Sequence, residues 1–295
     1  MRRWQRAREG GLRGLFFLCA LVSIAVTMGI ILVLFGESLP FFRHVPFTSF
    51  LFERSWAPRT GQEYGILPLV CGTFLIAVLA LAVAIPIGLA TAIYMSEYAA
   101  PVVRQVAKPV FEILAGVPTV VYGYFALTFI TPYLLRPLLP SIEVFNALSA
   151  AIVVGIMIIP TISSLCDDAL RAVPRSLREA GYAVSATKLE VCTRIVLPGA
   201  MSGVVAAVLL ALARAVGETM VVAIAAGSTP KITANPLVSV QTMAAYIVQV
   251  CKGDAPAGTI EYQSIYAVGL TLFAITLAVN VVAQKVMARF REVYE

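Results

Sequence analysis

The sequence predicts an all-α, polytopic membrane protein with six transmembrane helices. Of its 295 residues, 60% are hydrophobic and only 13% carry a charge, whereas charged residues make up about a quarter of a soluble chain. The charges are also clustered, and each long uncharged run between the clusters can cross the hydrocarbon core of a bilayer, which is roughly 30 Å thick. The composition therefore excludes a water-soluble globular fold.

The first predicted span follows a basic start. Residues 1–14 contain five arginines and one acidic residue, and the next 21 residues, 15–35, are uncharged. A secretory signal is the alternative, but the run is long for a signal core and no small-x-small cleavage site follows it. We therefore expect an uncleaved first span. The other spans are predicted at 64–96, 113–135 (interrupted by Pro118), 144–166, 195–230 and 262–284, with a short loop at 97–108 before the third.

Basic residues set the expected orientation. An even number of spans puts both termini on one side, where the segments hold 15 lysines and arginines against six on the other side. Because basic residues collect in cytoplasmic loops, both termini are expected in the cytoplasm. The predicted boundaries are a cytoplasmic N-terminus at 1–14, the first helix at 15–35, an extracytoplasmic loop at 36–65, a membrane domain at 66–288 with a cytoplasmic loop at 167–198, and a cytoplasmic tail at 289–295.

The long cytoplasmic loop carries two pairs of helix-start signals. Ser176 with Glu179, and Thr187 with Glu190, each fit the S/T-x-x-E capping box, in which hydroxyl and carboxylate satisfy the first free N–H groups of a helix. Two short helices are therefore expected, joined by a bend at 184–186 and held in water against the membrane. A solvated loop without helices is the alternative.

Two charged residues, Arg214 and Glu218, lie within the predicted fifth span. A charge near the bilayer centre costs about 3 kcal/mol even on lenient scales, so such residues face protein or water and are functional candidates. A spacing of four places them on the same helix face. The planar arginine fork matches phosphate, Glu218 can accept the proton that phosphate retains near neutral pH, and Thr219 adds a hydroxyl. The alternative is a structural pair that holds helices together.

The cytoplasmic loop also matches a family pattern. Glu179-Ala180-Gly181, Ser185 and Ile195-Val196-Leu197-Pro198 resemble the EAA loop of ABC importer permeases, E-A-A-x3-G-x9-I-x-L-P, with glycine for the third residue and serine for the later glycine. Glycine at 185 would take a left-handed cap conformation, which serine adopts at a cost. In that family the loop docks into a cleft on a separate ATPase subunit. The resemblance assigns ATPase coupling to Glu179, Ala180, Gly181, Ser185, Leu197 and Pro198. Pro198, which lacks an N–H, is also expected to stop the helix before it.

Three further stretches narrow the resemblance. RAVGETM at 214–220, AGVPTVVYG at 115–123 and residues 72–99 resemble the permease subunits of the phosphate-specific transport (Pst) importer, and look more like its C-type than its A-type subunit. The resemblance covers about residue 66 to the C-terminus and implies the type I ABC importer permease architecture. It assigns a substrate path to Arg214, Glu218, Thr219, Thr119 and Tyr122.

The same resemblance implies the partners and the location. It implies a heterodimer with a second, A-type phosphate permease subunit, two copies of an ATP-binding ATPase subunit and an extracytoplasmic phosphate-binding protein, in a bacterial or archaeal plasma (inner) membrane, with no nucleic acid. No G-x-x-x-x-G-K-[ST] phosphate loop occurs in the sequence, so we expect a non-enzymatic permease that binds no cofactor, while the partner ATPase uses ATP and Mg²⁺. The five cysteines share no close spacing and predict neither a disulfide framework nor a metal site.

Three alternatives remain on the sequence alone. One is an ABC permease for another oxyanion such as sulfate or molybdate, although a fully ionised anion gains nothing from Glu218. Another is a secondary transporter or channel, which would need an ion-coupling site and has no use for a docking loop. The last is a membrane scaffold or sensor, for which charges inside the membrane bring a cost without a benefit.

Overall fold

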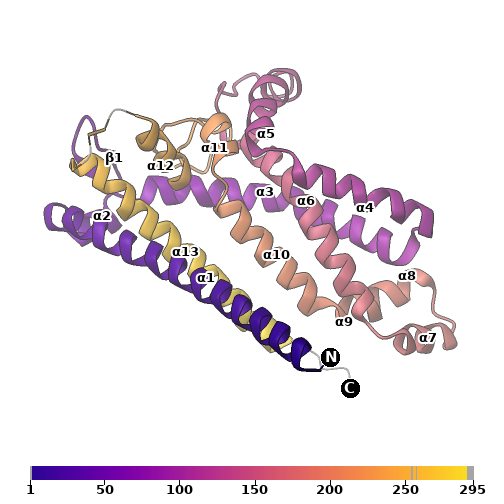
Figure 1. Ribbon diagram of the computed structural model, residues 1–295. Helices are drawn as coiled ribbons and strands as arrows, with labels where there is room; N and C mark the ends of the chain where they lie inside the picture. Colours follow the sequence, from indigo (N-terminus) through magenta and orange to yellow (C-terminus); the bar gives the residue numbers. More distant parts are fainter. Residues whose placement is uncertain (1, 254, 257, 291–295) are drawn as a thin grey trace.

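The computed structural model of the chain describes residues 2–253, 255–256 and 258–290. Long helices run side by side in an elongated bundle, with shorter elements at its two ends (Figure 1). The all-α class predicted from the composition is confirmed, and the strands of the described part are confined to one small hairpin. Four described helices are long and apolar enough to cross a membrane, and six spans result when each of two bent helix pairs is counted as one.

The first helix is longer than its uncharged run. Helix α1 (Arg2–His44) passes the predicted end of the first span at residue 35 and continues through Pro40. Its last turn is held by packing, since the side chain of Phe41 is completely buried. The predicted loop at 36–65 is therefore largely ordered structure: the end of α1, helix α2 (Phe47–Phe52), and the antiparallel strands β1 (Trp56–Ala57) and β2 (Glu63–Tyr64).

The centre of the bundle is a close pair of helices. Helix α3 (Leu67–Ile93), which continues into the π-helical turn η1 (Tyr94–Tyr98), packs along α6 (Ala147–Ala172). A Cβ atom on Gly155 would lie 2.9 Å from the Ala80 carbonyl oxygen, so only glycine permits this approach. Small residues at helix contacts are the usual way for membrane helices to gain packing.

The predicted third span is two elements set at a steep angle. Helix α4 (Pro101–Gly116) is followed by α5 (Thr119–Phe125) and the π-helical segment η2 (Ala126–Leu135), with a bend of 86° between them. The interruption expected at Pro118 is confirmed, because Val117 before it is extended (φ −64°, ψ 130°), as a residue before proline prefers. The loop predicted at 97–108 is wrong, because most of it belongs to η1 and α4.

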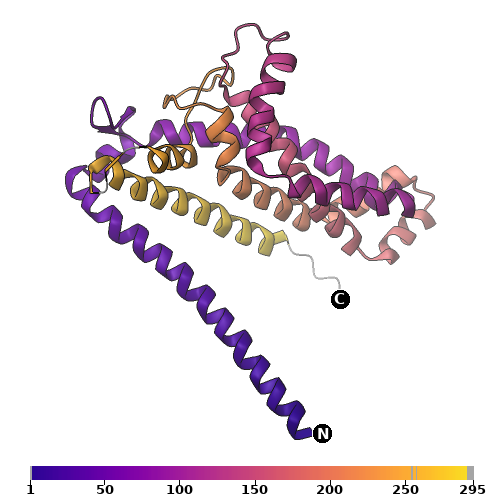
Figure 2. The ribbon, with the colours of Figure 1, turned by 45° about the horizontal axis from the view of Figure 1, so that its top comes forward.

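The predicted fifth span is also broken. Helix α10 (Met201–Val216) ends just before Gly217, and the short helix α11 (Met220–Ala225) begins after Thr219. An irregular segment then leads to α12 (Met243–Lys252). The final long helix, α13 (Ile260–Phe290), packs beside α1. Figure 2 shows that the rest of α1 diverges from the body of the bundle.

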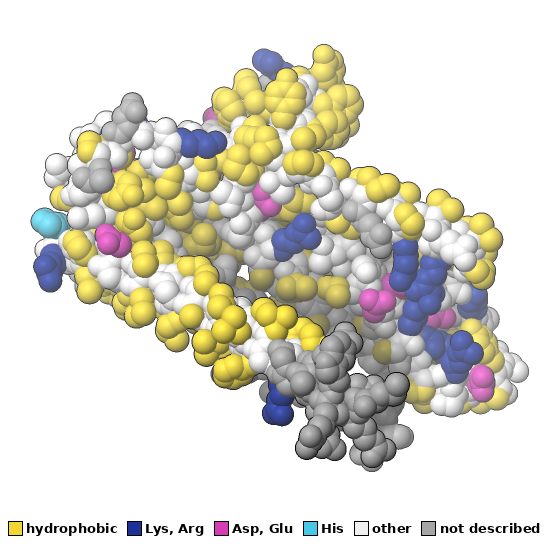
Figure 3. Space-filling view, in the orientation of Figure 1, with side chains coloured by type: hydrophobic (Ala, Val, Ile, Leu, Met, Phe, Trp, Pro, Cys, Tyr) yellow, Lys and Arg dark blue, Asp and Glu magenta, His cyan; other side chains and the backbone are white. Residues whose placement is uncertain are grey.

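The cytoplasmic loop predicted at 167–198 forms one end of the molecule. It contains the end of α6, helix α7 (Arg175–Ala183), helix α8 (Lys188–Val191), the π-helical turn η3 (Cys192–Val196) and helix α9 (Leu197–Gly199). We call this the coupling end. The end of α13 runs toward this side of the molecule in both ribbon views (Figure 1 and Figure 2). Figure 3 shows lysines and arginines gathered over the coupling end, whereas hydrophobic side chains cover the long helices.

Candidate functional site

The coupling end contains the two short helices that the sequence predicts. Thr187 caps α8 as expected: its Oγ1 accepts the Glu190 N–H at 3.3 Å, and Glu190 Oε2 accepts the Thr187 N–H at 2.9 Å. The other predicted capping box is wrong. Helix α7 begins after Pro174 with no side-chain cap, so Ser176 lies inside the first turn and its hydroxyl is not placed to cap it.

The bend between the helices is confirmed and lies where a glycine is usual in the family pattern. Ser185 has a φ of +60°, the left-handed conformation that was expected to be costly for serine. Pro198 does not stop the preceding helix, because it lies in α9, which follows η3 with no non-helical residue between them. The chain bends instead by 68° after Gly199, at the start of α10.

Gly181 lets α7 pack closely on the helices that follow it. The alanine of the family pattern would force neighbouring side chains to move. Gly181 is buried in α7, and a Cβ atom there would lie 2.6 Å from Ile195 Cδ1 and 3.0 Å from Val191 Cγ2. Helix α7 therefore rests directly on α8 and η3. Glu179 and Ala180 point the other way and are exposed, and Leu197 is half-buried against the core.

An exposed, partly apolar face results from this packing. Beside Glu179 and Ala180, the side chains of Tyr182, Val184 and Leu189 are 44%, 79% and 63% exposed. Large apolar side chains grouped on the surface of a polar loop commonly mark an interaction site. Of the residues that the family pattern assigned to ATPase coupling, this face carries Glu179 and Ala180, whereas Gly181 and Leu197 pack inward.

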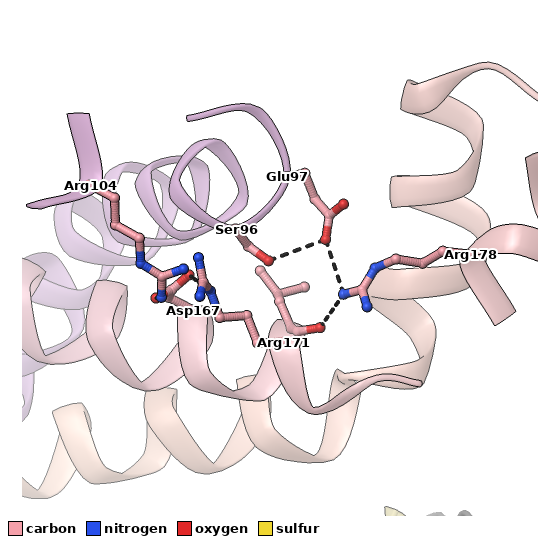
Figure 4. A network of polar contacts seen from close by, with 7 residues as sticks. Ser96, Glu97, Arg104, Asp167, Arg171 and Arg178 are labelled. Atoms are coloured by element: carbon pink, nitrogen blue, oxygen red, sulfur yellow. Dashed lines mark hydrogen bonds and ion pairs between the residues drawn. The ribbon is translucent and has the colours of Figure 1, made fainter. Parts of the chain in front are cut away.

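A half-buried arginine, Arg178, ties α7 to the membrane helices (Figure 4). Arg178 Nη2 lies 3.2 Å from Glu97 Oε1 of η1 and also donates to the Leu170 carbonyl at 2.7 Å, while Nη1 donates to the Val173 carbonyl at 2.7 Å. The two carbonyls lie at the end of α6, where helix carbonyls lack internal partners. One side chain thus joins three segments.

A second ion-pair group lies next to it. The buried carboxylate of Asp167 in α6 binds Arg104 of α4 at 2.6 Å and Arg171 at 3.1 Å. Nearby, the Lys188 ammonium lies 4.8 Å from the centre of the Tyr98 ring. Charged side chains therefore link the coupling end to η1, α4 and α6.

Sequence reasoning missed the partners in these two groups. Glu97 and Arg178 are separated by 81 residues, and Arg104 and Asp167 by 63. The i, i+4 spacing of Asp167 and Arg171 is the one signal that was visible within a helix.

The break between α10 and α11 separates the two charged residues of the predicted fifth span. Arg214 lies in the last turn of α10, and its Nη1 donates to Thr161 Oγ1 of α6 at 2.8 Å. Glu218 lies in the break, where its Oε1 accepts the N–H groups of Met220 and Val221, each at 3.2 Å. Within the described part of the chain, neither residue forms an ion pair, so the shared helix face predicted from their spacing is wrong.

The bend between α4 and α5 lies close to this break. Tyr122 is buried and donates from its hydroxyl to the Leu114 carbonyl at 2.8 Å, which holds the two sides of the bend together. Arg214 is within electrostatic range of this hydroxyl. A Cβ atom on Gly123 would lie 3.2 Å from Val221 Cα, so α5 and α11 approach closely and the two breaks meet.

The remaining predicted path residues occupy the same region but are used locally. Thr119 is the first residue of α5 and is half-buried. Thr219 Oγ1 donates to the Gly217 carbonyl at 3.1 Å, within its own turn. The structure therefore places Arg214 at the end of α10 and Glu218 and Thr219 in the break that follows, each hydrogen-bonded to a different partner.

Comparison with known proteins identifies the family. Residues 84–292 match the family described as the inner membrane component of binding-protein-dependent transport systems. The chain belongs to this family. It is thus a multi-pass membrane permease of the ABC importer class, and a permease of this class works together with other subunits.

Individual relatives agree with the Pst resemblance of the sequence. A phosphate transport system permease protein PstC of Xylella fastidiosa is 33% identical over 93% of this chain and 87% of its own length. The PstC protein of Mesorhizobium japonicum is 30% identical over 92% of this chain and 87% of its own length. A probable ABC transporter permease protein, YqgH of Bacillus subtilis, is 33% identical over 88% of this chain and 84% of its own length.

Solved structures show the same fold. A bacterial ABC transporter involved in the import of the acidic polysaccharide alginate matches with a TM-score of 0.68, covering 99% of this chain and 100% of its own, at 14% identity. The inward-facing MetNI methionine ABC transporter matches with a TM-score of 0.57 at 17% identity, and the match covers 77% of this chain and 95% of the transporter chain. The type I importer permease architecture is thereby confirmed, and these two likenesses concern the fold alone.

Proposed function

We propose that this chain is the C-type permease subunit of an ABC importer that moves inorganic phosphate into the cytoplasm. The observation that carries the proposal is the Arg214 guanidinium at the meeting point of two helix breaks, hydrogen-bonded to a hydroxyl and without a carboxylate partner in the described part of the chain. The names of the PstC relatives point to the same substrate.

The chemistry of this site suits a phosphate ion. A charge held inside the membrane is costly, and an arriving anion offsets that cost by charge-assisted hydrogen bonds to the planar guanidinium. Irregular backbone at membrane depth is tolerated where it lines a water-filled cavity, and both the α4–α5 and α10–α11 breaks supply it.

In this proposal, Glu218 makes the site prefer phosphate to sulfate. Its Oε1 accepts the two N–H groups at the start of α11, which leaves lone pairs on Oε2 for a further donor. Phosphate that retains a proton can donate to this oxygen, whereas sulfate has no proton to donate. The site therefore favours phosphate over sulfate through the carboxylate that would otherwise repel an anion.

The coupling end supplies the connection to ATP. The exposed face of α7 around Glu179 and Ala180 docks onto a separate ATPase subunit, present in two copies, which binds ATP and Mg²⁺ and performs the hydrolysis. A second, A-type permease completes the membrane unit, and an extracytoplasmic binding protein delivers phosphate. Both termini of this chain, like the coupling end, lie in the cytoplasm of a bacterial or archaeal cell.

The proposal is tested by ATP-dependent uptake of labelled phosphate into proteoliposomes that contain the assembled complex. Arg214→Ala removes the charged donors, and we expect uptake to fall about 10- to 100-fold, as the loss of charged hydrogen bonds predicts. In the unchanged complex, we expect that sulfate does not compete with phosphate for uptake. In the Glu218→Gln variant, sulfate should compete with phosphate. Arg136→Ala, which alters an exposed arginine after η2, is the matched control and should transport normally. Equal transport of sulfate and phosphate by the unchanged complex would refute the substrate.

A further inference from the structure

A cavity of about 380 Å³ lies between α4, α6 and α10, beside the Arg214 site. A water molecule takes a share of about 30 Å³ in the liquid, so the cavity has room for a small anion and several waters. Its walls include the apolar side chains of Phe111, Pro160 and Leu210. Apolar walls strengthen the electrostatic interactions inside a cavity, because they lower the local dielectric constant.

One polar stripe of α6 faces this cavity. Thr161 and Ser164 line it, three residues apart on one face of the helix, and Asp167 follows at the next turn. Thr161 Oγ1 is the atom that accepts the Arg214 hydrogen bond. The cavity therefore begins at the proposed phosphate site and extends toward the coupling end, by about 9 Å along the helix axis from Thr161 to Asp167.

The far part of the cavity contains one lysine and one aspartate. Lys108 of α4 lines it beside Asp167. The Asp167 carboxylate is already bound by Arg104 and Arg171, and Asp168 is also within electrostatic range of it. Because two arginines already offset the charge of the Asp167 carboxylate, the Lys108 ammonium can serve an anion at the end of the polar stripe.

We infer that this cavity is a second binding station for a tetrahedral oxyanion, with Lys108 as its cationic ligand and the hydroxyls of Thr161 and Ser164 as the route from Arg214. The inference rests on the proposed phosphate transport. An ion that must leave again needs weak binding at several sites. A lysine on a flexible stem presents a single point charge, and it holds an anion less specifically than the arginine fork at the first site.

Transport separates this role from a structural one. In proteoliposomes with the assembled complex, Lys108→Gln should lower phosphate uptake about tenfold while the ATPase activity stimulated by loaded binding protein persists. Lys108→Arg, which restores the charge, should restore uptake. Lys285→Gln alters an exposed lysine near the end of α13 and should leave uptake unchanged. Normal uptake with Lys108→Gln overturns the inference.

Labelling tests the cavity directly. Ser164→Cys, in a chain whose five native cysteines are replaced, is exposed to a membrane-impermeant thiol reagent in inside-out vesicles. Inorganic phosphate should slow the labelling, and should not slow it when Lys108→Gln is added. A phospholipid headgroup carries the same oxyanion chemistry. If anionic lipid protects the thiol and added phosphate has no further effect, the cavity binds lipid and the inference is overturned.

The two proposals fail in different ways. If the unchanged complex transports no phosphate, the proposed function fails and this inference fails with it. If the unchanged complex transports phosphate, but phosphate neither protects Ser164→Cys nor depends on Lys108 for uptake, only the second station is refuted.

Discussion

The two ends of the bundle are held together by different interactions. At one end, which we call the aromatic end, the rings of Phe41, Phe50, Trp56, Tyr64 and Tyr246 meet edge to face, with centroids 4.9–6.5 Å apart. At the coupling end the joints are ion pairs and charged hydrogen bonds, those of Arg178 with Glu97 and of Asp167 with two arginines. The aromatic end, which also carries the Arg59–Glu261 ion pair, is held mainly by its rings, whereas charged side chains join the coupling end to the membrane helices.

This difference matches what each end has to do. A ring cluster is close-packed, and any displacement forfeits contact area, so the aromatic end fixes α1, α12 and the strand hairpin as a rigid cap. The acceptors around Arg178 and the arginines around Asp167 offer alternative partners, so a charged joint can shift without losing all of its bonds. A charged joint that can exchange partners in this way is suited to transmit motion from a docked subunit.

The largest expected effect is at the centre of the aromatic end. Trp56 is 4% exposed and contacts three other rings. We expect Trp56→Ala to lower the free energy of unfolding by about 3–5 kcal/mol, because it leaves a cavity in a packed cluster. Thermal denaturation in detergent micelles measures this loss.

Trp56→Phe is the matched control for that measurement. The Trp56 indole N–H is buried and has no acceptor among the described residues, so phenylalanine keeps most of the ring packing and removes a donor that is left unsatisfied. We expect a cost below about 1.5 kcal/mol. If both variants lose the same stability, ring packing does not hold this end.

The next largest effect is at the coupling end. Arg178→Ala leaves Glu97, whose side chain is 8% exposed, without its cation. The free energy of unfolding should fall by about 3 kcal/mol. In the proposed phosphate importer, less substrate should enter per ATP hydrolysed, because α7 loses its tie to η1. Parallel measurements of ATPase activity and uptake give this ratio.

Arg175 lies one turn earlier on α7 and is exposed. Its replacement by alanine is the control, and it should change neither the free energy of unfolding nor the ratio of uptake to ATP hydrolysis. If Arg178→Ala lowers stability but keeps the ratio of uptake to ATP hydrolysis, the charged joint is structural and does not transmit motion.

Alkaline pH should destabilise the aromatic end by a smaller amount. Burial, together with the charge of Glu261, raises the pKa of Tyr64 above its usual value of 10.0, and burial also raises the pKa of Tyr246. A pKa that is raised in the folded state gives stability that is complete below pH 10 and is lost as the pH rises through the folded value. Unfolding should therefore become easier above pH 10, and Tyr64→Phe should remove part of this dependence. The prediction would be contradicted if the free energy of unfolding did not change up to pH 11 in either the unchanged protein or the Tyr64→Phe variant.

The smallest effect concerns the bend of the coupling end. Ser185 pays for its left-handed backbone (φ +60°), and glycine relieves this strain while it gains freedom in the unfolded chain. We expect Ser185→Gly to stabilise the protein by about 0.5–1 kcal/mol. Ser185→Ala, which keeps a Cβ atom, should give no stabilisation, and an equal gain from both variants would show that the strain lies elsewhere.

Local patterns in the sequence determined much of the fold. The uncharged runs located the long helices, the Thr187 capping box located the start of α8, and the left-handed bend at Ser185 and the interruption at Pro118 were each visible from residue type. These features depend on groups within about one helical turn, which the sequence places next to each other. The first capping box failed because α7 begins one residue before Ser176, and a boundary of that kind depends on the preceding proline.

The composition and the motifs thus fixed the class of protein and the residues worth testing, whereas the tertiary structure decided what those residues contact. It placed Arg214 on Thr161 and Glu218 on the start of α11, although their spacing favoured a common helix face. It also paired Arg178 with Glu97 across 81 residues. Helix breaks and long-range ion pairs depend on how distant segments return to one another, and no pattern within a single helical turn contains that information.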